Sequence, residues 1–297
     1  MFKITEKKLL APEIYLMKVD APRVAKSAKP GQFVIVIADE KGERIPLTIC
    51  DFDAKTDEIT IVFQAVGGST RQIAKLNVGD SFNNFVGPLG NPSEFVNEDI
   101  GTLKKEKIMF IAGGVGAAPV YPQLKYLHEL GIDADVIVGS KSKEYMILED
   151  EIRSTSGNFY PATDDGSYGF KGLVTNLLEE LVEKKGKKYD RVIAIGPMIM
   201  MKFVCSLTER LGIKTIISLN SIMVDGTGMC GACRVTVGGK TKFTCVEGPE
   251  FDGHLVDFNE TMRRQAIYKS EEAVELHKKN DIKEEGCFCR VDIGGEK

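Results

Sequence analysis

KIMFIAGGVGAAP, residues 107–119, is the stretch that decides the fold class. Its first six residues form an apolar run of the kind found in a strand buried on both faces, and a glycine-rich turn follows directly. Residues 120–130 then form an amphipathic stretch that predicts a helix. Because strand, glycine turn and helix in this order are the repeating unit of parallel α/β proteins, we expect a parallel sheet here.

The same alternation of strand and helix continues along the chain. Apolar runs at residues 134–138, 191–195 and 214–218 predict three more strands, and residues 173–182 predict a helix. We therefore assign residues 103–219 to a parallel-sheet α/β domain. This domain is the second of four regions that we distinguish along the chain by their sequence patterns.

Residues 1–102 have the pattern of an antiparallel β-barrel. Short apolar runs alternate with turn residues, as in KPGQFVIVIAD and EITIVFQAVGG. The segment Ser69–Leu76 is the one helical candidate, with Ser69 as its expected cap. We predict a small barrel for this region.

Composition limits the possible classes of function. The 297 residues are 43% apolar and 28% charged, which fits two globular domains with attachments. A net charge of -4 argues against a nucleic-acid-binding surface. The N-terminus has no apolar signal region, and no apolar run reaches the roughly 18 residues of a membrane span. Seven cysteines without a secretion signal indicate reduced thiols and metal ligands, and therefore the cytoplasm.

Two short motifs in the barrel region indicate a flavin site. In Arg44–Thr48 (RIPLT), the arginine suits a pyrophosphate and Thr48 suits the flavin N5, where it would be the catalytic, orienting group. Gly67–Thr70 (GGST) lies where a strand leads into a helix, and glycines and helix N–H groups favour a phosphate there. Taken alone, RIPLT is also typical of an edge strand with an exposed arginine, and GGST is also typical of a tight turn with a helix cap. The predicted flavin-binding residues are Arg44, Pro46, Leu47, Thr48, Phe63, Gln64, Ala65, Gly68, Ser69 and Thr70.

The glycine turn of the opening stretch suits a dinucleotide pyrophosphate, although Pro119 stands where the last glycine of G-x-G-x-x-G would be. Loops after later strands reach the same edge of the sheet, where ligands bind in open α/β folds. No acid follows the second strand, and Lys141 and Lys143 would suit a 2′-phosphate or water equally, so NAD and NADP both stay open. The predicted residues are Gly113, Gly114, Val115, Gly116, Pro119, Gly139, Ser140, Lys141, Asp164, Asp165, Gly196, Pro197 and Met198.

A cysteine-rich segment, residues 220–253, has the spacing of an iron–sulfur loop. Cys230, Cys233 and Cys245 supply three ligands, and Asp225 lies where a plant-type [2Fe–2S] loop has its first cysteine, giving D-x4-C-x2-C-x11-C. Glycines beside these residues suit a loop that turns N–H groups toward sulfur. Asp225 could alternatively cap an Asp-Gly turn, and zinc also fits a C-x2-C pair. Other candidates for the fourth ligand are Cys205, Cys287 and Cys289, while residues 254–297 predict a helical extension.

RIPLT, GGST, GGVGAAP, TDDGSYGFKG, GPMIMM and the cysteine loop occur in that order over nearly the whole chain. The chain thereby resembles the ferredoxin–NADP reductase superfamily, in the branch with a C-terminal [2Fe–2S] loop. That branch includes electron-transfer subunits of dihydroorotate dehydrogenase and small subunits of NADH-dependent reduced ferredoxin:NADP oxidoreductase. Asp225 and the tail after residue 248 are similar to the second of these.

The resemblance implies FAD, a [2Fe–2S] cluster with Asp225 as a ligand, and an NAD(H) site. It also implies a heterodimer with a large flavin and [4Fe–4S] subunit, through which electrons reach ferredoxin and NADP(H), with electron bifurcation. Hydride is expected to pass between the nicotinamide and the flavin, with no general base required. Two alternatives stay open: a dihydroorotate-linked electron-transfer subunit, and a zinc-stapled dinucleotide-binding module without redox chemistry.

Overall fold

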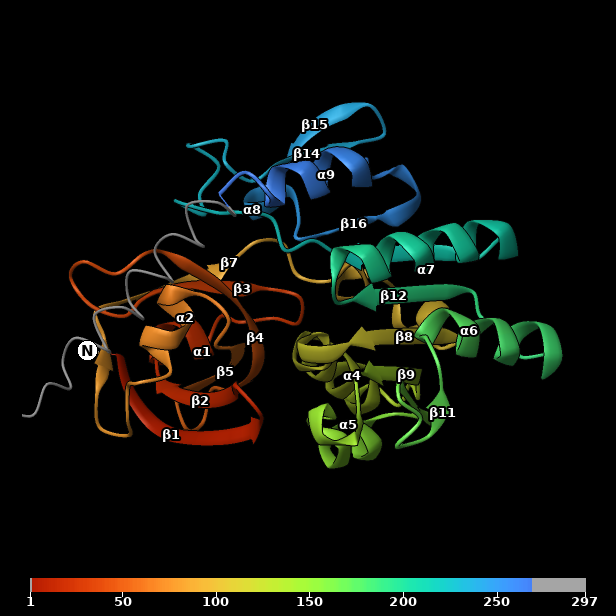
Figure 1. The fold of residues 1–297 in the computed structure, drawn as a ribbon, viewed down its shortest axis with the longest axis horizontal. Helices are drawn as coiled ribbons and strands as arrows, with labels where there is room; N and C mark the ends of the chain where they lie inside the picture. Colours follow the sequence, from red (N-terminus) through yellow and green to blue (C-terminus); the bar gives the residue numbers. More distant parts are fainter. Residues whose placement is uncertain (1, 269–297) are drawn as a thin grey trace, which may run out of the picture.

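The computed structural model describes residues 2–268 and places three regions side by side (Figure 1). The barrel, drawn in red to orange, lies beside a sheet domain drawn from yellow to green. The blue C-terminal segment lies across the top of both. No helix in the described part of the chain is both long and apolar enough to cross a membrane.

The N-terminal region is a seven-stranded antiparallel sheet, as the alternating sequence predicts, with strand order β6-β1-β2-β5-β4-β3-β7. Its interior is apolar and contains Met17, Ile49 and Phe82. The strands are β1 (Phe2–Ala11), β2 (Ile14–Asp20), β3 (Phe33–Ile37), β4 (Ile45–Asp53), β5 (Glu58–Gln64), β6 (Ser81–Phe82) and β7 (Asn84–Leu89).

Two short helices accompany the barrel, α1 (Pro22–Ala25) and α2 (Gly68–Ile73). The prediction that Ser69 caps the second helix is wrong, because the cap is Gly67. The Gly67 N–H donates to the Thr70 hydroxyl at 3.0 Å, while the Ser69 hydroxyl donates to Glu43. A glycine can begin a helix in this way when a side chain one turn later completes the cap.

The second region contains the predicted parallel sheet, with strand order β11-β10-β9-β8-β12-β13-β16. All neighbours in it are parallel except β16, which runs antiparallel to β13. The sequence predicted β9, β8, β12 and β13, which are consecutive neighbours in this order, and gave no range for β10, β11 or β16. The strands are β8 (Ile108–Gly113), β9 (Asp135–Ser140), β10 (Phe159–Thr163), β11 (Phe170–Lys171), β12 (Arg191–Ile195), β13 (Lys214–Ser218) and β16 (Glu250–Asp252).

Helices cover both faces of this sheet. On one face, α4 (Ala117–Glu129) and α5 (Glu149–Thr155) share an apolar core with residues of the barrel. On the other face lie α6 (Val174–Glu179), extended by a π-helical turn (Glu180–Lys184), and α7 (Met198–Leu211). The chain reaches one face after β8 and the other after β12, so the crevice between these neighbouring strands is a topological switch point.

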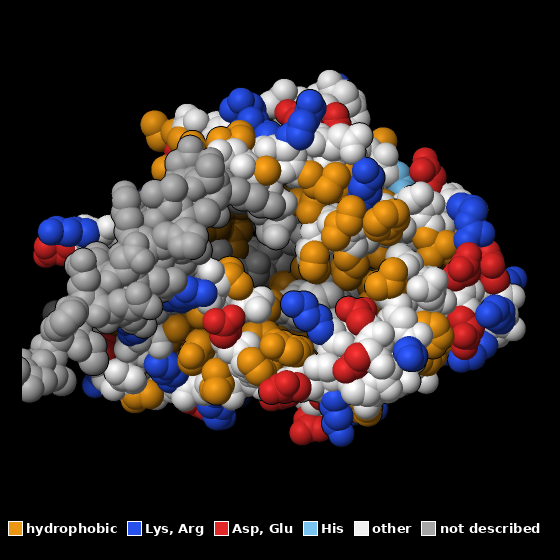
Figure 2. All heavy atoms as spheres, viewed as in Figure 1, with side chains coloured by type: hydrophobic (Ala, Val, Ile, Leu, Met, Phe, Trp, Pro, Cys, Tyr) orange, Lys and Arg blue, Asp and Glu red, His pale blue; other side chains and the backbone are white. Residues whose placement is uncertain are grey.

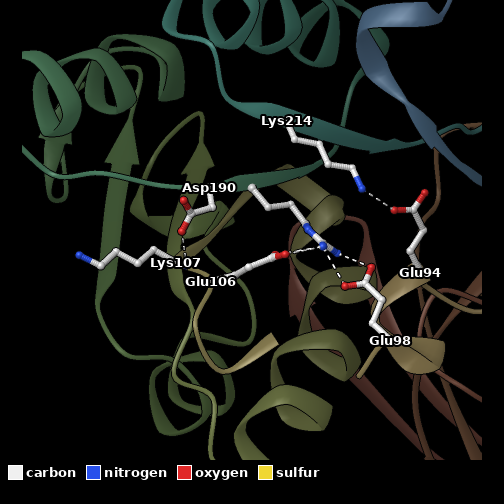
Figure 3. A network of polar contacts seen from close by, with 7 residues as sticks. Glu94, Glu98, Glu106, Lys107, Asp190 and Lys214 are labelled. Carbon is white, nitrogen blue, oxygen red and sulfur yellow. Dashed lines mark hydrogen bonds and ion pairs between the residues drawn. The ribbon is translucent and has the colours of Figure 1, made fainter. Parts of the chain in front are cut away.

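The sheet is fastened to its surroundings at the end opposite that crevice (Figure 3). The buried Arg191, at the start of β12, donates to both carboxylate oxygens of Glu98 at 2.8 and 2.9 Å and to Glu106 at 3.0 Å. Nearby, Lys214 pairs with Glu94 at 2.9 Å. Short elements lead into this network, η1 (Glu94–Asn97) and α3 (Ile100–Leu103).

The C-terminal segment adds a two-stranded hairpin and short helices, and it shares the apolar core beneath α7. Strands β14 (Arg234–Val237) and β15 (Lys240–Phe243) form the predicted hairpin, which turns at Gly238 and Gly239. Then come α8 (Thr244–Glu247), β16, a single 3₁₀ turn (Gly253–Leu255) and α9 (Phe258–Gln265), which is the described part of the predicted helical extension. The domain boundaries drawn from the sequence remain a prediction.

Candidate functional site

A cavity of about 940 Å³ opens between the barrel and the carboxyl ends of the parallel strands. Figure 2 shows the hollow near the centre of the visible face. Most predicted cofactor-binding residues line it, although they come from separate parts of the chain. These are Pro46, Leu47, Thr48, Phe63, Gln64, Thr70, Gly113, Gly114, Val115, Gly116, Pro119, Gly139, Ser140, Lys141, Asp164, Gly196 and Pro197.

On the barrel side, strand β4 presents Thr48 to the cavity. Leu47 and Ile49 pack in the barrel core, and because side chains alternate along a strand, Thr48 between them faces outward. Phe33, the cross-strand partner of Thr48 on β3, also lines the cavity. A hydroxyl is thus fixed on a rigid strand with apolar neighbours, as an orienting hydrogen bond to a flat ring requires.

On the sheet side, the glycine turn after β8 has no room for side chains. A Cβ on Gly116 would lie 2.1 Å from the Ile195 carbonyl oxygen, and a Cβ on Gly113 would lie 2.4 Å from the Met200 sulfur. Gly114 has φ +55°, which glycine adopts without strain. The backbone therefore passes close to β12 and leads straight into α4, leaving its N–H groups free of side-chain cover. These residues fit a dinucleotide pyrophosphate.

Several predicted residues do not line the cavity. The Asp165 carboxylate accepts the Ser167 N–H at 2.9 Å, and hydrogen bonds from Ser167 lower its pKa, as in a turn residue. Met198 is buried in the core beneath α7. The others are Arg44, Ala65, Gly68 and Ser69.

Arg44 has unexpected neighbours. Its Nε donates to the Val224 carbonyl, and its Nη2 donates to the Asp225 carbonyl at 3.1 Å. Two of the five guanidinium N–H groups are used in this way, so three are left for a phosphate. The residue therefore connects the barrel to the cysteine segment, 180 residues further along the chain.

The sequence interpretation did not find the residues from Ser218 to Ser221, nor Met223, which also line the cavity. Ser218–Ser221 could have been found, because they follow β13 at the same carboxyl edge as the predicted loops. Met223 and Phe33 carry no sequence pattern that distinguishes them from core residues. Other lining residues not predicted include Tyr145, Ile199, Met200 and Phe203.

The four predicted cluster ligands form two pairs. Cys233 and Cys245 are buried with their sulfur atoms 3.3 Å apart. Asp225 lies beside the exposed Cys230, whose N–H donates to its carboxylate at 2.8 Å. Since each iron of a two-iron cluster takes two protein ligands, this pairing fits a [2Fe–2S] cluster.

The loop around Asp225 turns its amide groups inward. The Asp225 carboxylate accepts N–H groups of Thr227 at 2.9 Å, Met229 at 3.1 Å and Cys230. These hydrogen bonds, from Thr227 first, lower the pKa of the carboxyl group. The residue therefore caps its own loop, and its carboxylate has lone pairs left for a metal. Gly226, Gly228 and Gly231 all have positive φ, which the tight loop requires.

The buried Cys245 thiol needs a nearby cation to ionise. Burial, helped by the neighbouring Cys233, raises the pKa of Cys245 to about 12. An iron bound there would supply the positive charge that deprotonates such a thiol. Within residues 2–268, no three histidine, cysteine or acidic side chains are grouped as a single metal ion would need.

The remaining cysteines lie apart from the loop. Cys50 and Cys205 are buried among apolar side chains, and burial raises the pKa of the Cys205 thiol to about 12. Cys205 lies on α7 against Gly253, so it fills core space rather than approaching Cys230. Cys287 and Cys289 lie outside the described residues.

The cavity and the cysteine pair share a wall. Phe33 and Met223 line the cavity and also pack in one small apolar cluster with Cys233 and Cys245. A ring bound in the cavity would therefore lie against Phe33 and Met223, the apolar side chains that are clustered with the two thiols. This arrangement suits the transfer of electrons between two bound groups.

Comparisons with known proteins agree with this geometry. The sequence model of the iron–sulfur cluster binding domain of dihydroorotate dehydrogenase B matches residues 220–257. An uncharacterized protein of Clostridium beijerinckii is 60% identical, covering 98% of this chain and 100% of that protein. A homolog of the dihydroorotate dehydrogenase B (NAD(+)) electron transfer subunit from Thermotoga maritima is 43% identical, covering 92% of this chain and 93% of that protein.

Among solved structures, a chain of NADH-dependent reduced ferredoxin-NADP oxidoreductase, studied for flavin-based electron bifurcation, is 40% identical with a TM-score of 0.86. The match covers 94% of this chain and 97% of that one. The similarity therefore includes the barrel, the parallel sheet and the cysteine segment together.

Proposed function

Since the chain belongs to the ferredoxin–NADP reductase superfamily, in the branch whose electron-transfer subunits carry an iron–sulfur binding domain, we propose that it passes electrons between NAD(H), FAD and a [2Fe–2S] cluster. It is an oxidoreductase of the NAD(P)H-linked type. More specifically, we propose that it is the small subunit of an electron-bifurcating, NADH-dependent reduced ferredoxin–NADP oxidoreductase. The wall that the cavity shares with the buried cysteines is the observation that carries this function.

The barrel residues fit the flavin. Thr48 and the backbone of Pro46 and Leu47 would hold the ring edge in the cavity. Thr70, on the first turn of α2, also lines the cavity, and we propose that the pyrophosphate lies between it and the free N–H groups of Arg44 outside the lining. When bound, FAD exchanges a hydride with a nicotinamide and single electrons with an iron–sulfur centre. The Thr48 hydroxyl orients the ring, and the apolar Phe33 excludes water from its surroundings.

The nucleotide would lie along the carboxyl ends of β8, β9 and β12. The glycine turn brings N–H groups to its pyrophosphate, and Gly196 and Pro197 line the cavity directly beside Gly113. The side chains of Asp164 and Lys141 lie further along the cavity lining, toward β9 and β10. No proton-transfer dyad is needed, because a hydride carries its own proton and electrons.

The chain is similar to subunits of heteromeric complexes, and it works with a larger partner subunit. We propose that this partner carries a second flavin and [4Fe–4S] clusters and binds NADP(H). The exposed Cys230 and Met229, at the tip of the cluster loop, are the parts of the site that a partner can approach.

A dihydroorotate-linked role is the second candidate, because the cysteine segment matches the dihydroorotate dehydrogenase B domain. Purification of the tagged chain from its source under anaerobic conditions separates the two. A co-purifying flavin and [4Fe–4S] protein is the expected result. A barrel-type dihydroorotate dehydrogenase in its place would reject the bifurcating assignment and support the second candidate.

A further inference from the structure

Two arginines from outside the cluster loop (Asp225–Cys233) donate hydrogen bonds to it. Arg44, just before strand β4 of the barrel, holds the carbonyls of Val224 and Asp225. Arg264, on helix α9, donates from its Nη2 to the Ala232 carbonyl at 3.0 Å. The Arg44 contact lies at Asp225, the first expected ligand of the loop. The Arg264 contact lies at Ala232, between Cys230 and Cys233.

The contact at Arg44 belongs to a tight joint between loop and barrel. A Cβ on Gly226 would lie 2.4 Å from the Ile35 Cδ1 atom and 3.0 Å from the Leu89 Cδ1 atom. The turn therefore lies directly on strands β3 and β7. Because Arg44 and Ile35 are fixed by the barrel, they fix the start of the loop relative to the cavity.

The contact at Arg264 gives helix α9 a role that the electron-transfer function has not so far explained. The helix lies next to the β14–β15 hairpin (Figure 1) and is anchored through the buried Phe258. One residue after Arg264, Gln265 donates to the backbone and side-chain oxygens of Asn220 at 3.0 and 2.7 Å. The helix thus holds both the entry to the cysteine segment, at Asn220, and the end of the cluster loop, at Ala232.

Both arginines add positive charge where negative charge is concentrated. Three thiolates and the Asp225 carboxylate are four anionic ligands, and reduction of a cluster between them adds one more electron. A guanidinium stays charged at all relevant pH values and stabilises nearby anions. Its effect is larger on the more negative, reduced state, so it raises the reduction potential.

We propose that Arg44 and Arg264 are positioning residues that clamp the cluster loop from two sides and favour the reduced state of its cluster. The proposal rests on the proposed [2Fe–2S] function. It assigns the C-terminal helix α9 to the electronic tuning of the site.

Arg264 provides the sharper test, because it lies on a different element from the flavin-binding strands. We expect Arg264→Gln, in the full chain with its partner, to give a more negative midpoint potential and changed g-values in the EPR spectrum of the reduced cluster. Arg263→Gln is the matched control, since Arg263 is the exposed neighbour on the same helix. Arg264→Lys should shift the midpoint potential less than Arg264→Gln does, while still changing the g-values. Lysine keeps the positive charge but lacks the planar, forked guanidinium group.

Equal effects of Arg264→Gln and Arg263→Gln on potential and g-values, including no effect, would overturn the proposal for α9. Loss of iron from Arg264→Gln alone, with unchanged circular dichroism and flavin content, would support the positioning part. Failure of the proposed function is recognised separately, since wild-type protein would then show no [2Fe–2S] signal at all.

Arg44 is tested alongside, with samples saturated in FAD. We expect Arg44→Gln to shift the cluster potential and g-values, whereas Arg23→Gln, at an exposed arginine of the same barrel, leaves both unchanged. If Arg44→Gln weakens FAD binding but leaves the cluster spectrum and potential as in wild type, Arg44 serves only the flavin and the clamp is rejected.

Discussion

Glu250 of β16 accepts a hydrogen bond from the Gln123 amide of α4 at 2.8 Å. The same carboxylate oxygen accepts the hydroxyl of Ser93, which follows the last barrel strand, at 2.9 Å. One carboxyl group therefore joins the barrel, the parallel sheet and the segment that follows the cluster loop. Its side chain is half-buried, while both donors are buried.

Glu250 makes stability depend on pH. Burial, reinforced by the nearby Glu94 charge, outweighs its two hydrogen bonds and raises its pKa from 4.5 to about 7. The native state therefore binds this proton more tightly than the unfolded state, and the free energy of unfolding falls as pH rises from about 4.5 through 7. The shift corresponds to at most about 3 kcal/mol.

We expect Glu250→Gln to flatten that fall, because the amide needs no proton and can still accept both hydrogen bonds. Unfolding of wild type and variant is compared at several pH values between about 5 and 8. Glu94→Gln, which removes a neighbouring charge, should lower the Glu250 pKa and give an intermediate curve. Parallel curves for wild type and Glu250→Gln would show that this carboxyl does not titrate in the window.

Asp225 is expected to be an iron ligand as well as a loop cap, and asparagine separates the two roles. Asp225→Asn keeps one oxygen, enough either for the Thr227 N–H or for the N–H groups of Met229 and Cys230, and removes the charge that iron requires. We expect the variant to lose iron or to give a clearly different EPR spectrum. Asp225→Cys, which restores an anionic ligand, should hold the cluster with a shifted potential. A wild-type spectrum in Asp225→Asn would leave Asp225 as a cap alone.

Thr48 is expected to orient the flavin through its hydroxyl. Replacing it with valine preserves shape and removes one hydrogen bond, worth about 1 kcal/mol, so flavin reduction by NADH should slow roughly 5-fold. Thr48→Ser keeps the hydroxyl and should stay close to wild type. Stopped-flow absorbance at saturating NADH measures the rate of flavin reduction in both variants. Equal rates in the valine and serine variants would remove this role from Thr48.

Arg191 is expected to support stability without touching the site. It lies at the opposite end of the parallel sheet, where arginine-to-methionine replacement leaves Glu98 and Glu106 facing each other in a half-buried pocket. The loss should be about 3–5 kcal/mol in the free energy of unfolding. Lys214→Met, which breaks the exposed pair with Glu94, should cost under about 1 kcal/mol. Similar losses in both variants would contradict this assignment.

The sequence was informative where one segment alone determines the structure. The short apolar run before Gly113, followed by a glycine turn, predicts a buried strand. The pair Gly238–Gly239 permits the tight turn of a hairpin. Strands β11 and β16 were not predicted, because they are only two and three residues long and gain their stability from neighbours in the sheet. Strand β10 is as long as the predicted β12 and β13, but Pro161 interrupts its pattern.

In the candidate site, too, only the features that depend on one segment or on the topology of the sheet could be predicted. Most predicted residues in the loops at the carboxyl ends of the strands line the cavity, since topology alone brings those ends together, while Asp165 and Met198 do not. The contacts of Arg44 with the cluster loop and of Glu250 with Ser93 and Gln123 could not be predicted. They join residues more than 120 positions apart, and their geometry depends on how whole regions pack.

Anaerobic titration of the purified protein with NADH, followed by visible absorbance and EPR, is the most direct test of electron transfer from nicotinamide through flavin to cluster. The protein should contain about two irons and about one FAD per chain. NADH should bleach the flavin, and a [2Fe–2S] signal should then appear. Zinc in place of iron, or a flavin that NADH reduces with no signal from the cluster, would contradict the proposed function.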